Sequence, residues 1–239
     1  MRVAAISDIH GNLPALEAVL ADIEREGVDG VVVVGDVVTG PFSAEVFDLL
    51  ASVPDVRFVR GNVERTVLEG VDEYGRDWDE ERRRLGDARL GAVAGWPRTV
   101  ELEVDGLGRV LVCHSTPASD EPIYTRITPE EELVRLFEEV EANVVLCGHT
   151  HMQYDRALSN GLRLVNPGSV GLPYEGRRGA YWAVIGPDVG FRRTEYDLEE
   201  AARAMRALVG SIYEEQLALL LDPMDPDRAT AEFEKLRVA

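Results

Sequence analysis

The sequence predicts an α/β fold in which two β-sheets pack together and helices cover their outer faces. In the first third of the chain, short apolar runs alternate with helical segments, which favours parallel strands joined by right-handed crossovers. Further along, two apolar runs flank a glycine-containing turn, a pattern typical of an antiparallel hairpin. No shift in composition marks a boundary before Asp197. We therefore expect one domain over residues 1–197, followed by a helical appendage over residues 198–239.

The first third of the chain is expected to form strand, helix, strand, helix and strand. These elements are Val3–Ser7, Leu13–Arg25, Val31–Val34, Ala44–Ala51 and Val56–Val59. Asn12 can cap the first helix, and Pro14 suits its first turn. The run of valines at 31–34 has no polar position, which predicts a strand buried on both faces.

The remainder of the chain combines a charged helix, a hairpin and further buried strands. The helix is expected over Asp72–Arg89, with Trp78 and Leu85 as its anchors in the core. Strands are expected at Thr99–Val104, Arg109–Cys113, Val144–Cys147, Arg163–Asn166, Tyr181–Ile185 and Phe191–Tyr196, and a helix at Pro129–Val140. The appendage is expected to contain the helices Glu199–Val209 and Ser211–Leu221, with a break at Asp222–Pro226.

Composition restricts the location and the partners of the protein. No apolar run approaches the roughly 18–20 residues that span a bilayer, and the N-terminus lacks a signal-peptide pattern, so a cytoplasmic location is expected. Cys113 and Cys147 lie in predicted buried strands, where free cysteines pack as small apolar residues. The net charge of −19 disfavours general binding to duplex nucleic acid and to anionic membranes. The sequence does not predict the oligomeric state.

Side chains that can bind metal ions follow the carboxyl ends of five predicted strands. They are Asp8, His10, Asp36, Asn62, His114, His149 and His151. Every histidine of the chain belongs to this set. Ligands of open α/β sheets bind just beyond the carboxyl ends of the strands, and these donors suit divalent Mn, Fe, Zn, Ni or Co. Strand alternation predicts that residues two apart, as in Asp8 with His10 and His149 with His151, face one cavity.

Each motif alone has a simpler interpretation. Asp-x-His commonly forms a turn or a cap, and Gly-Asp after a strand commonly starts a loop. Two histidines on one strand can be ordinary surface residues. A rival metal site that uses Cys113 and Cys147 is disfavoured, because adjacent strand residues such as Cys113 and His114 point to opposite faces. Together, in this order and at strand ends, the motifs predict a metal site.

The same segments resemble the calcineurin-like metallophosphoesterase superfamily, and most closely its small prokaryotic phosphodiesterase branch. They are Asp8-Ile-His10-Gly-Asn12, Gly35-Asp36, Gly61-Asn62, His114 and Gly148-His-Thr-His151. The resemblance extends to about Ile185 and includes Asn166–Gly171. It implies a four-layer α/β sandwich, with two mixed β-sheets packed together and flanked by helices.

The resemblance also implies two divalent metal ions, Mn, Ni, Fe, Zn or Co. By motif position, one ion would take Asp8, His10 and His151. The second ion would take Asn62, His114 and His149, and Asp36 would bridge both. Asn12 and Asn166 match no ligand position, and Asn12 is expected to cap its helix.

The implied activity is hydrolysis of small phosphodiesters, by in-line attack of a hydroxide that bridges the two ions. Asp36, Asn62 and His114 are the expected catalytic residues. Many superfamily members carry a histidine after Gly-Asn that helps to protonate the leaving group, whereas this chain has Val63. Arg60 and Arg65 flank the motif, and either arginine could bind a substrate phosphate. We expect both to be exposed or ion-paired instead.

Two alternative functions remain open at this point. One is a phosphomonoesterase or a protein phosphatase, which Val63 disfavours. The other is a non-catalytic scaffold for protein contacts, as in a retromer subunit of similar fold. Val63 and an apolar face of the appendage favour the scaffold; that face contains Leu208, Ile212, Leu217 and Leu220. We expect this face to pack on the chain itself, and the complete ligand set favours an enzyme.

Overall fold

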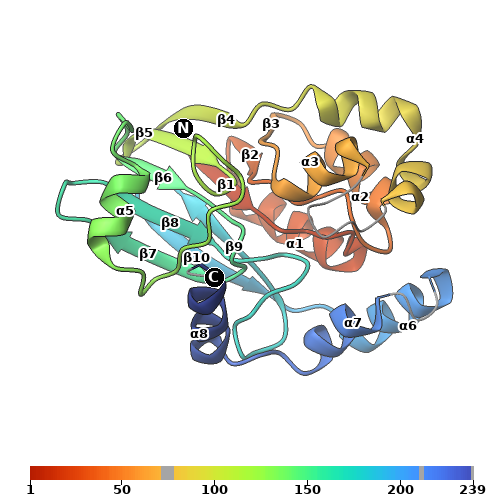
Figure 1. Cartoon of the computed structure of the whole chain (residues 1–239). Helices are drawn as coiled ribbons and strands as arrows, with labels where there is room; N and C mark the ends of the chain where they lie inside the picture. Colours follow the sequence, from red (N-terminus) through yellow and green to blue (C-terminus); the bar gives the residue numbers. More distant parts are fainter. Residues whose placement is uncertain (71–77, 210–212, 238–239) are drawn as a thin grey trace.

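The computed structural model describes residues 1–70, 78–209 and 213–237, and it contains two five-stranded mixed sheets (Figure 1). The first sheet has the order β10-β9-β1-β2-β3, and the second has the order β4-β5-β6-β8-β7. The first sheet comprises β1 (Val3–Ile6), β2 (Gly30–Val33), β3 (Val56–Phe58), β9 (Ala180–Ile185) and β10 (Val189–Thr194). The second comprises β4 (Thr99–Val104), β5 (Gly108–Cys113), β6 (Val144–Leu146), β7 (Gln153–Ala157) and β8 (Arg163–Pro167).

The described residues form eight helices, and some of these cover the outer faces of the sheets. The eight helices are α1 (Leu13–Glu26), α2 (Ser43–Ala51), α3 (Asn62–Glu69), α4 (Asp79–Ala94), α5 (Glu130–Leu136), α6 (Leu198–Val209), α7 (Glu214–Leu221) and α8 (Pro226–Arg237). In Figure 1, α1 to α4 lie beside the first sheet and α5 lies against the second. The four layers of the predicted sandwich are therefore helices, sheet, sheet and helix.

Side chains alternate along the strands, so each sheet contributes to one core on its outer face and to one core that lies between the two sheets. Ala4 and Ile6 of β1 pack with the helices of the outer layer, whereas Val3 and Ala5 pack between the two sheets. On β5, Val112 belongs to the core between the sheets. Both β1 and β2 are buried on both faces, and for β2 this confirms the interpretation of the valine run at 31–34.

The parallel strands place their carboxyl ends at a common edge. In the first sheet β1 pairs in parallel with β2, and β2 pairs in parallel with β3. In the second sheet β5 and β6 are also parallel, whereas β4 and β5 form the predicted antiparallel hairpin. The segments that follow β1, β2, β3, β5 and β6 carry all seven predicted ligands: six lie in loops, and Asn62 is the first residue of α3.

Three elements were missing from the sequence prediction. They are α3, β7 and α8. The predicted helix Asp72–Arg89 corresponds to α4, which begins at Asp79 and extends to Ala94; residues 72–77 lie outside the described residues. Trp78 and Leu85 are buried, as predicted for its anchors.

The C-terminal helices pack on loops of the chain itself. Leu217 and Leu220 of α7 are buried in a cluster with residues of α6, and Leu172 and Tyr196 pack against this cluster. Leu208 of the same predicted face is exposed, and Ile212 lies outside the described residues. The division into residues 1–197 and 198–239 stays a prediction. Within the part of the chain that the structure describes, no helix is long and apolar enough to cross a bilayer.

Candidate metal centre

The structure brings all seven predicted ligands together at the shared strand edge. The donor atoms form two groups, and within each group all of them lie within 4.8 Å of one another. The first group comprises Asp8, His10, Asp36 and His151, and the second comprises Asp36, His114 and His149. Asn62 joins the second group, because its Oδ1 lies 3.0 Å from Nε2 of His114. The carboxylate of Asp36 belongs to both groups.

The backbone at this edge is unusual. Five predicted ligands have positive φ angles, at +53° for Asp8, +46° for His10, +56° for Asp36, +71° for His149 and +59° for His151. Non-glycine residues rarely adopt this left-handed conformation, which tends to persist where the surrounding structure enforces it at functional sites. The sequence analysis assumed an extended backbone here, and that assumption was wrong: β1 and β6 end before these residues, and loop turns aim the side chains. Asp8 and His10 nevertheless face one donor group.

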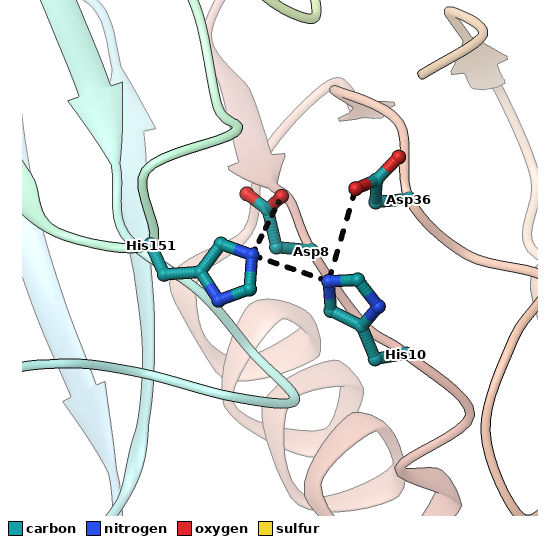
Figure 2. A group of neighbouring side chains, drawn as sticks. All are labelled: Asp8, His10, Asp36 and His151. Atoms are coloured by element: carbon teal, nitrogen blue, oxygen red, sulfur yellow. Dashed lines mark hydrogen bonds and ion pairs between the residues drawn. The ribbon is translucent and has the colours of Figure 1, made fainter. Parts of the chain in front are cut away.

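In the first group the side chains point toward one another (Figure 2). Oδ1 of Asp8 lies 3.3 Å from Nε2 of His151, which lies 3.2 Å from Nε2 of His10. Nε2 of His10 lies 3.8 Å from Oδ2 of Asp36. Donors held about 2.0–2.2 Å from one ion lie about 3 Å apart, so this spacing suits a single cation between them.

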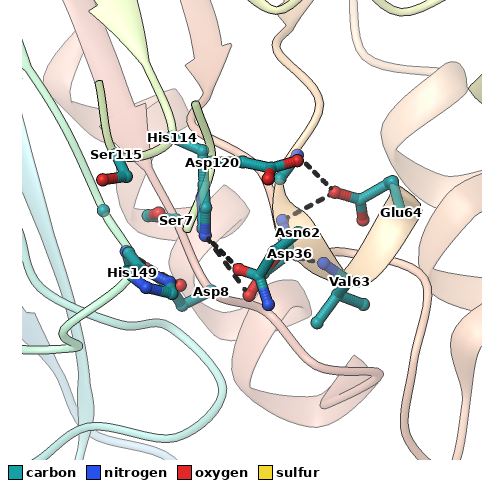
Figure 3. A network of polar contacts seen from close by, with 12 residues as sticks. Ser7, Asp8, Asp36, Asn62, Val63, Glu64, His114, Ser115, Asp120 and His149 are labelled. Atoms are coloured by element: carbon teal, nitrogen blue, oxygen red, sulfur yellow. Dashed lines mark hydrogen bonds and ion pairs between the residues drawn. The ribbon is translucent and has the colours of Figure 1, made fainter. Parts of the chain in front are cut away.

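The second group is arranged around the other side of Asp36 (Figure 3). Oδ2 of Asp36 lies 3.4 Å from Nε2 of His114, and the ring of His149 lies edge-on to His114 at 5.1 Å between centroids. The backbone N–H of His149 also donates to Oδ1 of Asp8 at 3.2 Å. The two groups are therefore linked through Asp36 and through Asp8.

Backbone carbonyls orient two of the histidines from behind. Nδ1 of His114 lies 2.7 Å from the carbonyl oxygen of Val34, and Nδ1 of His151 lies 2.7 Å from that of Leu172. Since Nδ1–H must donate in each pair, Nε2 is the ring nitrogen that faces the centre. Histidines that bind metals are commonly held in this way.

The electrostatics of the site favour anionic carboxylates. Burial raises the pKa of Asp8 and of Asp36, but neighbouring imidazoles, His151 for Asp8 and His114 for Asp36, outweigh it and lower both values. Burial and His151 lower the pKa of His10 to about 4. Burial and His114 likewise lower that of His149 to about 4. Both imidazoles are therefore neutral at pH 7, the form that binds metals.

His114 differs because the carboxylates dominate its surroundings. Burial lowers its pKa, yet Asp36 and Asp8 overcome that effect and raise it to about 10. A cation that enters the second group must therefore displace a proton from His114.

One buried atom supplies the test of whether these residues suit a cation. Oδ2 of Asp8 is fully buried and has no hydrogen-bond partner among the described residues. An ionised carboxylate oxygen is very costly to bury without a partner. A divalent ion would satisfy it, and the oxygen and imidazole donors around it match the preferences of such ions.

A family comparison identifies the architecture. The model of the Calcineurin-like phosphoesterase superfamily domain matches residues 1–185. The chain belongs to this superfamily.

Three individual proteins are similar to this chain over most of its length. An uncharacterized protein of Methanocaldococcus jannaschii is 26% identical over 227 residues, covering 83% of this chain and 89% of its own. The crystal structure of a metallophosphoesterase from Sphaerobacter thermophilus is 27% identical, covers 93% of this chain and 98% of its own, and has a TM-score of 0.74. A hypothetical protein of Pyrococcus horikoshii is 20% identical, with a TM-score of 0.77 and coverage of 94% and 99%; this likeness shows the fold.

Glycines allow the calcineurin-like loops to approach closely. A Cβ at Gly61 would lie 2.2 Å from Oδ1 of Asp36, and a Cβ at Gly148 would lie 2.1 Å from Oγ of Ser7. Gly61 has a φ of −94°, so its requirement is steric rather than conformational.

Val63 occupies the position at which many superfamily members carry a histidine. Its side chain belongs to the core beneath the helices, and its backbone N–H donates to Oδ1 of Asp36 at 3.0 Å. The N-terminus of α3 therefore stabilises the shared carboxylate. An aliphatic side chain cannot transfer a proton to a leaving group.

Glu64 is the functional residue that sequence reasoning missed. Its carboxylate is fully buried and accepts four backbone hydrogen bonds. The donors are the N–H groups of Asp36 at 2.9 Å, Val37 at 2.7 Å, Val38 at 3.2 Å and Gly61 at 2.8 Å. One side chain thus ties the loop that carries Asp36 to the turn that carries Asn62. The sequence signal was a glutamate three residues after an N-cap, which is half of a capping box.

Other predicted residues have structural roles. Oδ1 of Asn12 accepts from the N–H of Ala15 at 3.2 Å, so Asn12 caps α1 as expected. Nδ2 of Asn166 donates to the carbonyl oxygen of Gly148 at 2.7 Å and so supports the histidine loop. Arg65 pairs with Asp120, at 3.0 Å between Nε and Oδ1.

The remaining candidates are engaged elsewhere. Arg65 also pairs with Glu121 and Glu69, which leaves it engaged by carboxylates rather than open to phosphate. Cys113 and Cys147 are buried in the core that faces α5, on the opposite side of β5 from His114. The rival metal site is therefore excluded, because the side chains of both cysteines point into this core and not toward the histidines.

Proposed function

We propose that this chain is a dinuclear-metal-dependent phosphoesterase that hydrolyses small phosphodiesters. The observation that carries the proposal is the position of Asp36, whose carboxylate belongs to both donor groups. A shared carboxylate at the centre of two imidazole-rich groups fits two neighbouring cations better than one. Membership of the superfamily supports the phosphoester class.

Two divalent ions, when bound, would activate water as a nucleophile and neutralise charge on the phosphoryl oxygens. The protein's own contribution is to hold the donors in fixed directions. Asp8 and Asp36 supply the negative charge, while the Nδ1 contacts of His114 and His151 keep their Nε2 atoms directed inward. Asn62 contributes an amide next to His114. We assign Asp36, Asn62 and His114 to the catalytic centre on these grounds.

A dependence of the rate on the leaving group follows from Val63. Since no proton can come from this position, reaction depends on how well the departing oxygen carries negative charge. Within a series of bis-aryl phosphates, we expect kcat/KM to fall steadily as the pKa of the departing phenol rises. Alkyl diesters should react much more slowly. Steady-state rates of Mn²⁺-loaded protein across the series measure this dependence, and a flat profile would contradict it.

Divalent ions are expected to raise the melting temperature. One site at a free ion concentration of 100 times Kd adds about 2.7 kcal/mol, and about 2–4 °C accompanies each kcal/mol in a chain of this size. Chelator-treated protein should therefore melt several degrees higher after Mn²⁺ is added. Differential scanning calorimetry measures the shift, with KCl at equal ionic strength as the control. An unchanged midpoint with Mn²⁺, Ni²⁺, Fe²⁺, Zn²⁺ and Co²⁺ would oppose the proposed centre.

Mono-aryl and bis-aryl phosphates separate the remaining functions. Faster turnover of the monoesters would favour a phosphomonoesterase or a protein phosphatase. Binding of two ions without turnover of either class would favour the scaffold. Faster turnover of the diesters is the result that we expect.

A further inference from the structure

The C-terminal helices contact the first donor group but lie beyond the residues that the superfamily model matches. The first contact comes from α7. Nε2 of Gln216 donates to the backbone carbonyl of His10 at 3.2 Å. His10 has a φ of +46°, a conformation that needs support from its surroundings. Gln216 therefore holds a strained turn that aims the imidazole of His10 at the centre.

The second contact runs through Leu172. Its carbonyl oxygen accepts from Nδ1 of His151 at 2.7 Å, while its side chain packs against the apolar cluster of α6 and α7. Within that cluster Leu217 is buried, with 1% of its surface exposed. The helices thus fix the position of the carbonyl that orients His151.

The third contact is an aromatic stack that begins on α8. The ring of Tyr174 lies parallel to that of His151, with 5.2 Å between centroids and 9° between planes. The ring of Tyr174 also contacts that of Phe233 of α8, with 5.8 Å between centroids and 54° between planes. Phe233 therefore contacts the ring that lies against His151.

Polar contacts fasten α8 next to this stack. Glu234 accepts from Oγ1 of Thr125 at 2.5 Å and also from Thr128. Oγ1 of Thr230 contacts Sδ of Met152 at 3.4 Å, one residue after His151. The helix is thus attached to the loops around the first group.

The second donor group has different supports. His114 is held by the carbonyl of Val34 and by Asn62, and Nε2 of His149 lies 3.3 Å from the carbonyl of Glu121. Over the described residues, none of the hydrogen bonds or ring contacts of α6, α7 and α8 reaches His114 or His149. The C-terminal helices therefore support only one of the two groups.

We propose that α7 and α8 position His10 and His151 and thereby set the cation affinity of the first donor group, independently of the second. This inference rests on the proposed dinuclear centre. Gln216, Tyr174 and Phe233 are its positioning residues. Outer contacts of this kind typically change metal affinity about 10–100-fold.

Calorimetric titration of the metal-free full chain with Mn²⁺ tests the inference without any substrate. Wild-type protein is expected to bind two ions. Gln216→Ala and Phe233→Ala should each weaken one of them about tenfold and leave the other unchanged. The matched controls are Glu215→Ala on α7 and Leu236→Ala on α8, both at exposed positions, and both should bind two ions as the wild type does.

Two background variants assign the weakened ion to a group. His149→Ala disables the second group, so adding Phe233→Ala to it should weaken the remaining ion about tenfold. His10→Ala disables the first group, so Phe233→Ala should then have no further effect. Equal weakening in both backgrounds would show a general packing role and overturn the inference.

A conservative pair separates positioning from folding. Tyr174→Phe keeps the stacked ring and should retain wild-type affinity, whereas Tyr174→Ala should weaken the same single ion. If wild-type protein binds two ions and none of the positioning variants changes either affinity, the inference fails while the proposed function stands. If wild-type protein binds no divalent ion, both fail.

Discussion

Asp36→Asn is expected to reduce phosphodiester turnover at least about a thousandfold, while the chain remains folded. Asparagine has the same shape and can still accept the N–H of Val63, which now bonds to Oδ1 at 3.0 Å. It lacks the negative charge that both donor groups share. Charge stabilisation by bound cations is worth several kcal/mol, and about 4 kcal/mol corresponds to about three orders of magnitude in rate. Steady-state kinetics with a bis-aryl phosphate measure the loss.

Asp55→Asn is the matched control for this substitution. Asp55 is also an aspartate with positive φ, at +51°, but it is exposed and lies before β3, away from the centre. The same chemical change there should leave both turnover and Mn²⁺ binding intact. Turnover that survives Asp36→Asn would show that Asp36 is not the essential shared ligand.

Glu64→Gln is expected to destabilise the fold by about 3 kcal/mol and to weaken cation binding. Each carboxylate oxygen of Glu64 accepts two N–H groups, so an amide NH₂ would face two donors and bond to neither. Two hydrogen bonds to a charged group are worth about 1.5–3 kcal/mol each. The released loop carries Asp36, so the defect should extend to the metal centre.

Two measurements check this prediction, and Glu69→Gln on the same helix is the control. Urea unfolding gives the change in free energy, and Mn²⁺ titration gives the change in affinity. Glu69 is largely exposed, and among the described residues it pairs with Arg65, so its loss should cost less than about 1 kcal/mol. Wild-type stability in Glu64→Gln would mean that the four hydrogen bonds are dispensable.

Much of the centre could be predicted from the sequence, because the fold brings strand ends together. Once Val31–Val34 is recognised as a buried strand, the following Asp36 must emerge at the edge where Asp8 also emerges. The same logic places His114 and His149. Donor type and strand position were therefore sufficient to select the candidate ligands, and the structure brings these side chains together.

What the sequence could not supply is the part that depends on backbone conformation and on distant contacts. The left-handed turns at Asp8 and His151 are set by the loops around them and leave no periodic signature. The carbonyl oxygen of Leu172 orients His151, but every residue type has this backbone group, so the sequence cannot indicate its role. Likewise α8 was not predicted, because the prolines at 223 and 226 indicated only a break.

The left-handed turns also limit how this pocket could be redesigned. Asn, Asp, His and Gly tolerate positive φ far better than β-branched residues, and an unsuited residue there costs about 1–3 kcal/mol. The backbone conformation therefore limits which residue types can replace a ligand without loss of stability, whatever chemistry they would bring. This applies at Asp8, His10, Asp36, His149 and His151. In a mutant library designed for a new reaction, a larger share of the variants should fold if these five positions are restricted to Asn, Asp, His and Gly.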